Sequence, residues 1–281
     1  MSALRHPARP PIGRDTRLCM SLSARPSNFG SRFHNSLYDQ LGLDYVYKSF
    51  STKDLPGAIG GIRALGIRGC AISMPFKEAV IPLLDGLEGS ARAIDSVNTI
   101  VNDDGRLTGY NTDYSAVRAL LAQAGIGRDT RFILRGSGGM AKAVAAALRD
   151  EGVERGLIVA RNADAGPALA ATYGYDWAAD LPDIADTPPL LINVTPIGMA
   201  GGDEDALPFP EAMVAAADIA FDVVAFPVET RFLALAQGLG KRRITGAEVA
   251  VLQALEQFVL YTGVTPDAGQ VRIAAEAART A

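Results

Sequence analysis

The stretch Gly136-Ser137-Gly138-Gly139-Met140-Ala141 decides the fold of this chain. Residues 131–134 before it are short and largely apolar, as in a buried strand, and the alanine-rich residues 140–149 after it favour a helix. In such a G-x-G-x-x-A turn, the first glycine permits a tight turn, the second lets a pyrophosphate approach the backbone, and Ala141 lets the helix pack on the strand. Free N–H groups at the start of that helix bind phosphate. The pattern favours a dinucleotide site, although glycine-rich turns also follow ordinary strands.

The composition indicates a two-domain α/β protein that binds small molecules. The chain has 281 residues, enough for two domains, and apolar strands alternate with alanine-rich helices. Its 27 basic and 31 acidic residues give a net charge of −4, which offers no basic surface for nucleic acid. Cys19 and Cys70 lie in apolar segments, so we predict neither a disulfide framework nor a metal site, and a reducing, cytoplasmic setting fits.

The first fifteen residues and the apolar segments show no signal peptide and no membrane span. Residues 1–15 contain arginines and prolines but no apolar run, so we expect a loose tail rather than a signal peptide. No apolar segment approaches the length of a membrane-spanning helix, so no membrane association is predicted. The patterns leave open whether the chain is a monomer or a homodimer.

The residues before the glycine-rich stretch are expected to form an α/β unit of their own. Strands predicted at 18–22, 45–50 and 69–73 alternate with helices predicted at 33–41 and 55–65. The turn Asn102-Asp103-Asp104-Gly105 ends in Asp-Gly between two apolar runs, which is a hairpin signal. We predict two domains, one of residues 1–112 with 247–281 and the other of residues 113–246.

The choice between NADP and NAD depends on the end of the next strand, 157–160. A dinucleotide fold carries an acidic residue near this point to bind the ribose hydroxyls, or an arginine where a 2′-phosphate is present. Here the strand ends at Arg161, and no carboxylate lies between Leu157 and Ala163. A cation at this position favours NADP. Asp164 is close enough to keep NAD open.

Two later apolar strands, 190–194 and 219–224, end in polar or proline-containing loops. In open α/β sheets such strand ends line the ligand crevice. The predicted cofactor-lining positions at or after these strand ends are Thr195, Val224 and Gly246. Gln253 is a polar residue within the apolar helix that follows, which makes it a candidate for binding a substrate.

Lys77 and Asp113 are the candidate catalytic residues. Reduction of a ketone by a nicotinamide needs a proton donor, and a partly desolvated lysine oriented by a carboxylate can act as one. The chain has 2 histidines, one in the tail and the other, His34, at the expected start of a helix. Taken alone, Lys77 and Asp113 are more often a surface charge and a helix cap.

Six ordered motifs resemble the shikimate dehydrogenase family over residues 18–265. They are Ser73-Met74-Pro75-Phe76-Lys77, Asp95-Ser96-Val97-Asn98-Thr99, Gly109-Tyr110-Asn111-Thr112-Asp113, the glycine-rich stretch, Asn193-Val194-Thr195-Pro196-Ile197-Gly198-Met199, and Gln253. The resemblance implies an N-terminal α/β substrate domain, completed by the C-terminal helices, and a Rossmann-type NADP-binding domain. It also implies reduction of 3-dehydroshikimate to shikimate with NADPH.

The resemblance implies roles for several residues. Lys77 and Asp113 match the catalytic pair, while Asn98 and Gln253 match positions that hold substrate hydroxyls. Arg161 matches the arginine at the adenosine 2′-phosphate. Met199 falls in the loop near the nicotinamide.

The chain departs from the family where the substrate carboxylate binds. Family members carry Ser-x-Ser-Pro a few residues before His-Asn, and those serines hold the carboxylate. Counting back from His34 without a gap places Asn28 and Gly30 there, whereas Ser21 and Ser23 would need an insertion after them. Two further changes are the replacement of Asn-Val-Thr by Ala71-Ile72-Ser73, which keeps one hydroxyl at Ser73, and the replacement of a tyrosine by Ala225.

Arg25 lies in the same loop and is a candidate for a bidentate contact with the carboxylate, or else a solvent-exposed residue. Our hypothesis is an NADP-dependent oxidoreductase of the shikimate dehydrogenase-like branch. It would act on shikimate or a related cyclic hydroxy acid, with acid-base catalysis by Lys77 and Asp113. The alternatives are a quinate/shikimate dehydrogenase that uses NAD, and a protein that senses NADP(H) without catalysis.

Overall fold

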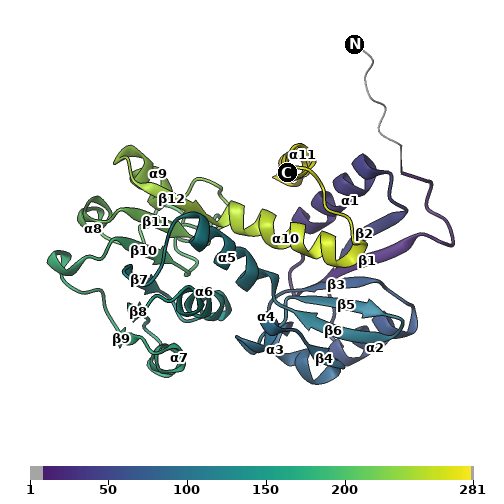
Figure 1. Cartoon of the computed structure of the whole chain (residues 1–281), viewed down its shortest axis with the longest axis horizontal. Coiled ribbons are helices and arrows are strands. Elements are labelled where there is room, and N and C mark those ends of the chain that lie inside the picture. Colours follow the sequence, from purple (N-terminus) through teal and green to yellow (C-terminus); the bar gives the residue numbers. More distant parts are fainter. Residues whose placement is uncertain (1–8, 280–281) are drawn as a thin grey trace, which may run out of the picture. The chain divides into compact units, whose positions relative to one another are not determined.

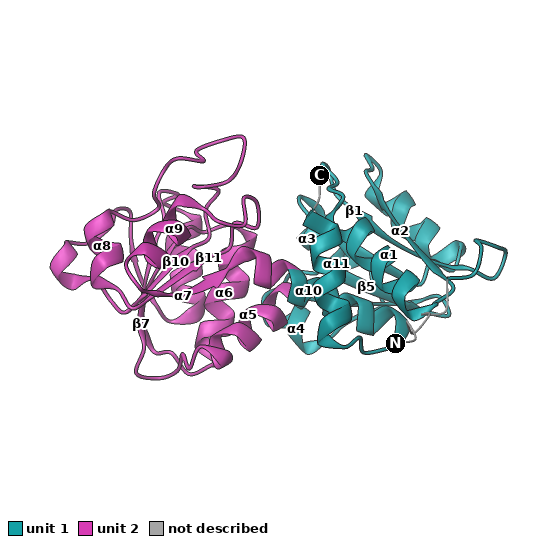
Figure 2. Cartoon of the chain, turned by 90° about the horizontal axis from the view of Figure 1, so that it is seen from above, with its two compact units in different colours: residues 1–112, 251–281 teal, residues 113–250 magenta. Residues whose placement is uncertain are grey.

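The computed structural model describes residues 9–279, which divide into two compact units. Unit 1 contains the chain up to Thr112 and again from Val251 onward, and unit 2 is Asp113–Ala250 (Figure 2, teal and magenta). Helix α10 (Gly246–Thr262) runs through the second junction, and its first residues belong to unit 2. The junction therefore lies after residue 250, whereas the sequence placed it after residue 246.

Unit 1 is built on a six-stranded mixed sheet in the order β2-β1-β3-β5-β6-β4 (Figure 1). Its strands are β1 (Arg17–Leu22), β2 (Tyr45–Phe50), β3 (Gly69–Ile72), β4 (Gly86–Leu87), β5 (Thr99–Asp103) and β6 (Arg106–Tyr110). β1 pairs in parallel with β2 and β3, while β5 runs antiparallel to β3 and β6. The predicted alternation of three strands with two helices and the predicted hairpin are both confirmed.

Helices cover both faces of this sheet because alternate strand residues point to opposite sides. Cys19 packs in a cluster with α1 (Phe29–Leu41), α10 and α11 (Ala268–Arg279), and Met20 packs in a second cluster with α2 (Leu55–Ala64). The remaining helical segments of the unit are short: α3 (Phe76–Ala79), η1 (Ile81–Leu83) and α4 (Gly89–Arg92). The two cysteines therefore lie in separate clusters, Cys70 belonging to the second.

Helix α1 begins earlier than predicted, at Phe29 instead of Phe33. The expectation that His34 opens this helix was therefore wrong, and its ring is fully buried. It stacks on Tyr47, with ring centroids 4.4 Å apart. Burial lowers the pKa of His34 to about 3, so the ring is neutral and serves as a core residue.

The predicted loose tail is anchored at Arg9. Residues 1–8 lie outside the described part of the chain. The Arg9 guanidinium donates to Asn35 Oδ1 at 3.1 Å and to the Tyr45 carbonyl at 3.2 Å, and it pairs with Asp39 at 3.1 Å. The expectation of a loose tail was therefore wrong for Arg9.

Unit 2 contains a six-stranded parallel sheet in the order β12-β11-β10-β7-β8-β9. Its strands are β7 (Arg131–Arg135), β8 (Arg155–Val159), β9 (Asp176–Ala178), β10 (Leu190–Asn193), β11 (Ile219–Asp222) and β12 (Arg242–Thr245). The strand order reverses between β7 and β10, as in doubly wound dinucleotide-binding folds. The predicted Rossmann-type fold is confirmed, while the short edge strands β9 and β12 were missed.

The helices of unit 2 are α5 (Thr112–Gln123), α6 (Gly139–Asp150), α7 (Ala165–Tyr173), α8 (Glu211–Ala216) and α9 (Arg231–Gly238), with η2 (Ile184–Asp186). The predicted helix at residues 140–149 is α6, which begins inside the glycine-rich stretch at Gly139. Its alanines are buried, with Ala141 fully so, and their small side chains allow close packing on the sheet. Within residues 9–279, no helix is long and apolar enough to cross a membrane.

Candidate functional site

The carboxyl ends of β7, β8 and β10 border a cavity of about 710 Å³ in unit 2. It lies where the strand order reverses, which is where open α/β sheets bind ligands. Five of the predicted cofactor residues line it: Gly136, Ser137, Gly138, Arg161 and Thr195. Four polar residues that we did not predict also line it: Arg135, Asn162, Asp180 and Asp203.

The two glycines of the G-x-G turn, Gly136 and Gly138, differ in their surroundings. Gly136 has φ +124°, and a Cβ there would lie 2.8 Å from Val194 Cγ2, so the backbone itself requires glycine. Gly138 stands at the N-cap position of α6 with φ −81°, and a Cβ there would meet no atom within 4 Å. The space above Gly138 is open to a ligand, next to the N–H groups that begin the helix. Gly139 and Met140 are the first two residues of α6.

Asp222 joins the loops after β10 and β11. Its carboxylate accepts hydrogen bonds from Thr230 Oγ1 at 2.7 Å, Asn193 Nδ2 at 3.0 Å and the Val224 N–H at 3.1 Å. Asn193 Oδ1 in turn accepts from Thr195 Oγ1 at 2.6 Å. This buried network holds Thr195 at the cavity. The sequence did not lead us to predict Asp222, the residue at its centre. The available signal was an aspartate at the end of an otherwise apolar strand.

Burial raises the pKa of Asp222 to about 6 despite its three hydrogen bonds. The folded protein therefore keeps this proton at pH values where the unfolded chain has lost it, so the stability contributed by Asp222 falls as pH rises from about 4 to about 6. We expect the free energy of unfolding of wild type to fall by up to about 3 kcal/mol relative to Asp222→Asn across this range. Denaturant unfolding at several pH values measures it, and a constant difference between the two proteins would contradict the assignment.

The other predicted cofactor residues do not line this cavity. Val224 is 1 % exposed, and a Cβ on Gly246 would lie 2.4 Å from its carbonyl oxygen. These two residues therefore pack backbone against backbone. Met199 is 45 % exposed in the loop after β10, and that loop is tied to the next by a bond from the Ala200 N–H to the Phe226 carbonyl at 3.1 Å.

In unit 1, backbone hydrogen bonds bring Lys77 and Asn98 to the end of β3. The Val97 N–H donates to the Lys77 carbonyl at 2.9 Å, and the Ile72 N–H donates to the Asn98 carbonyl at 2.7 Å. Lys77 is half-buried in α3, and Ser73 is exposed directly after β3. The structure thus places three of the predicted substrate-side residues on neighbouring segments.

A buried polar cluster connects Asn98 to helix α10. Asn98 Oδ1 accepts from Thr99 Oγ1 and from the Thr112 N–H, each at 2.8 Å, while Asn98 Nδ2 donates to Thr112 Oγ1 at 3.0 Å. Gln257 Nε2 donates to Thr99 Oγ1 at 3.0 Å and to Gln253 Oε1 at 3.1 Å. We missed Thr99, Thr112 and Gln257. The four-residue spacing of the two glutamines on one helix was the available signal.

The two alignments of the missing serines differ in how well they fit strand β1. Ser21 lies inside β1, paired with Ser49 of β2 and Ala71 of β3, so moving it into a loop would break the strand. Asn28 is exposed at the N-cap position of α1, and Arg25 is exposed in the preceding loop. The count without a gap, which places Asn28 and Gly30 at these positions, therefore fits the fold.

Asp113, the second member of the predicted catalytic pair, follows Thr112 of the polar cluster directly in the chain. It lies in the first turn of α5, is half-buried and is the first residue of unit 2.

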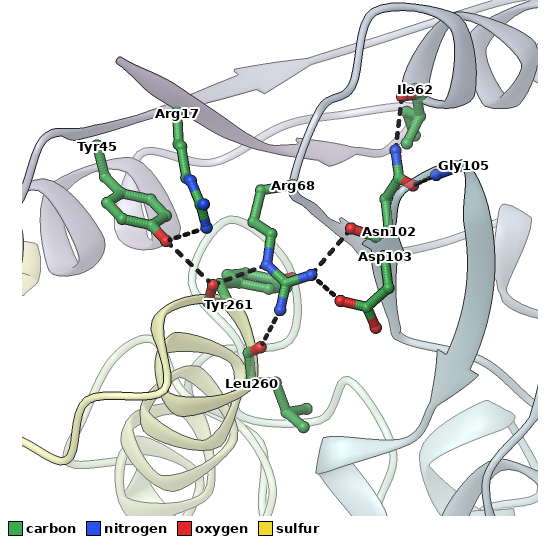
Figure 3. A network of polar contacts seen from close by, with 9 residues as sticks. All are labelled: Arg17, Tyr45, Ile62, Arg68, Asn102, Asp103, Gly105, Leu260 and Tyr261. Carbon is green, nitrogen blue, oxygen red and sulfur yellow. Dashed lines mark hydrogen bonds and ion pairs between the residues drawn. The ribbon is translucent and has the colours of Figure 1, made fainter. Parts of the chain in front are cut away.

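The end of α10 is held by Arg68, as Figure 3 shows. Its guanidinium donates to the carbonyls of Tyr261 at 2.9 Å and Leu260 at 3.2 Å, and on its other side to the carbonyl of Asn102 at 2.9 Å and to the Asp103 carboxylate. A positive charge at these carbonyls also complements the helix dipole. The contact lies one turn beyond Gln257 and supports its position.

We expect Arg68→Ala to lower the free energy of unfolding by about 2 kcal/mol, because two charge-assisted hydrogen bonds to helix carbonyls and two to β5 are lost. Arg17→Ala is the control, since Arg17 is exposed and donates only to Tyr45 Oη, at 3.2 Å, among the side-chain hydrogen bonds of the described residues. Urea unfolding compares the two. Equal losses of stability would show that Arg68 does not anchor α10.

The chain is similar to known proteins along nearly its whole length. Residues 28–100 match the family model of the shikimate dehydrogenase substrate binding domain. A shikimate dehydrogenase-like protein of Haemophilus influenzae is 54% identical over 270 residues, covering 96% of this chain and 99% of its own.

Solved structures of related proteins are similar to this chain over nearly its whole length. The shikimate 5-dehydrogenase of Thermus thermophilus, in complex with NADP(H) and shikimate, is 30% identical with a TM-score of 0.82, covering 93% of this chain and 99% of its own. A 5-ketofructose reductase of a Gluconobacter strain is 28% identical with a TM-score of 0.84, covering 94% and 99%. With a 54% identical relative matched along nearly its full length, and with the glycine-rich turn between β7 and α6, this chain belongs to the shikimate dehydrogenase family.

Proposed function

We propose that this protein is an NADP-dependent dehydrogenase that interconverts a ketone and a secondary alcohol on a small hydroxylated substrate, with 3-dehydroshikimate and shikimate as the reference pair. The observation that carries the proposal is the hydrogen bond from the Val97 N–H to the Lys77 carbonyl, which places Lys77 against the residue before Asn98, a member of a buried cluster of amides and hydroxyls. A proton donor next to groups that bind hydroxyls suits the reduction of a polyhydroxy ketone.

The cavity of unit 2 is the proposed cofactor site. Arg161 stands at the end of β8, where a dinucleotide places its adenosine ribose, and a cation there suits a 2′-phosphate. The open space at Gly138 and the start of α6 suit the pyrophosphate. Thr195 and Met199, in the loop after β10, and the backbone at Val224 and Gly246 would border the nicotinamide end. When bound, the cofactor supplies or accepts the hydride.

The residues of the chain supply proton transfer and orientation. Lys77 would donate a proton to the oxygen of the ketone during reduction and accept it back during oxidation. Asp113 is the proposed carboxylate that orients the lysine. The Asn98 amide donates one of its two N–H groups to Thr112, so its second N–H is the proposed donor to a substrate hydroxyl. Gln253 takes the corresponding role from α10.

The carboxylate of a cyclic hydroxy acid would be bound by Ser73, Asn28 and Arg25. Arg25 supplies the charge, and its exposure leaves its guanidinium able to form a bidentate pair.

A second substrate class is favoured by Gly30. It has no side chain, and a Cβ there would already lie 3.4 Å from the Tyr47 hydroxyl, so this position offers no hydroxyl to a carboxylate. The chain is also similar to a reductase named for 5-ketofructose, an uncharged sugar ketone. A neutral polyhydroxy ketone is therefore the second candidate substrate.

One assay tests the proposal. NADPH absorbance is followed with 3-dehydroshikimate, 3-dehydroquinate and 5-ketofructose, each repeated with NADH, and NADP⁺ binding is measured separately by calorimetry. Turnover with NADPH supports a dehydrogenase, and the preferred ketone identifies its substrate class. Turnover of dehydroquinate with NADH would instead support a quinate/shikimate dehydrogenase that uses NAD. Tight NADP⁺ binding without turnover of any ketone would support the sensor alternative and overturn the proposal.

A further inference from the structure

Arg135 occupies an unusual place for a charged residue. It is the last residue of the central strand β7, directly before Gly136, and pairs with Val159 of β8 and Asn193 of β10. Its carbonyl accepts from the Val194 N–H at 3.0 Å, so its backbone is fixed on the sheet. The side chain is half-buried and lines the proposed cofactor cavity together with Arg161.

Neither arginine forms an ion pair with a described residue. Asp180 and Asp203 also line the cavity without pairing with them. The Arg135 guanidinium donates to the Pro208 carbonyl, which engages one of its five N–H groups. Among residues 9–279, no carboxylate therefore pairs with either arginine of this cavity.

The two arginines are close enough to affect one another. Burial, and next the positive charge of Arg161, lower the pKa of Arg135. The turn after Arg161 is also fixed, because Asn162 Oδ1 accepts from the Asp164 N–H at 3.0 Å and the Ala165 N–H at 2.9 Å. Repulsion between two cations in a partly buried cavity is relieved when an anion binds to both.

We propose that Arg135 and Arg161 together hold the 2′-phosphate on the adenosine ribose of the cofactor, so that Arg135 is a second residue specifying NADP over NAD. The inference rests on the proposed function, because it assumes an NADP site in this cavity. The 2′-phosphate is favoured over the pyrophosphate because Arg161 stands at the end of β8, where the ribose hydroxyls bind. A doubly charged phosphate accepts hydrogen bonds from two guanidinium groups at once.

The test is calorimetric titration of the full-length protein with NADP⁺, NAD⁺, 2′,5′-ADP and 5′-AMP. Arg135→Gln keeps a donor for the Pro208 carbonyl but removes the charge. We expect it to weaken NADP⁺ and 2′,5′-ADP binding about tenfold, while NAD⁺ and 5′-AMP change less than about twofold. The control is Arg128→Gln, because Arg128 is an exposed residue paired with Glu154, and no change is expected. Thermal unfolding of each variant checks the fold.

The outcomes separate this inference from the proposed function. Equal weakening of NADP⁺ and NAD⁺ by Arg135→Gln would assign Arg135 to the pyrophosphate and overturn the inference. An NADP⁺ preference that survives Arg135→Gln but disappears in Arg161→Gln would also overturn it, with the proposed function intact. A wild-type protein without any preference for NADP⁺ would overturn both. Measurable coupling between the two substitutions in a double-mutant cycle supports a shared phosphate.

Discussion

Lys77→Ala is expected to lower kcat by about 10³-fold, within the range that a positioned acid-base group contributes. Lys77 lies in unit 1, whereas the residues that line the proposed cofactor cavity all belong to unit 2. NADP⁺ affinity should therefore stay within about twofold of wild type, since the variant loses the proton donor and keeps the cofactor site. Steady-state kinetics with the best ketone of the panel, together with calorimetry for NADP⁺, measure both quantities.

Lys53→Ala is the matched control, because Lys53 is an exposed lysine of the same unit and its loss should leave kcat unchanged. Partial recovery of Lys77→Ala by a small added amine would show that the missing function is proton transfer. A variant with near-normal kcat would remove Lys77 from the mechanism. A parallel loss of thermal stability would mean that the lysine supports the fold.

Gly138→Ala is expected to weaken NADP⁺ binding by about 100-fold while leaving the apo protein as stable as wild type. The added methyl group meets no protein atom within 4 Å, and φ at this residue is −81°, so the fold accepts alanine. The same methyl group would fill the space through which a pyrophosphate approaches the backbone. Calorimetry for NADP⁺ and thermal unfolding give the two readouts.

Gly136→Ala is the contrasting variant. Its φ of +124° and the 2.8 Å approach to Val194 Cγ2 make alanine strained there, so a loss of stability is expected even without cofactor. Tight NADP⁺ binding by Gly138→Ala would show that the phosphates do not lie against this turn. Equal destabilisation by both substitutions would show that neither glycine is reserved for the ligand.

Local features were predictable because their causes are local. The strand, glycine turn and helix around Gly136 follow from residues next to one another in the chain, as does the hairpin at residues 102–105. Errors arose where tertiary burial outweighed local preference. The sequence placed His34 at a helix start, but packing against Tyr47 and neighbouring rings draws it into the core, and α1 begins one turn earlier. The short edge strand β12, with two arginines in four residues, gave no apolar signal.

The sequence by itself determined the α/β class, the strand, glycine turn and helix around Gly136, and the family, because glycine turns, alternation and ordered motifs depend on neighbouring residues. Only the tertiary structure showed that Gln257 reaches Thr99 across 158 positions of the chain, that Asp222 links two loops, and that Arg135 shares a cavity with Arg161. Strand pairing and helix packing create these contacts. No periodicity or spacing encodes which distant side chains meet, since that depends on how the elements are arranged around the sheets.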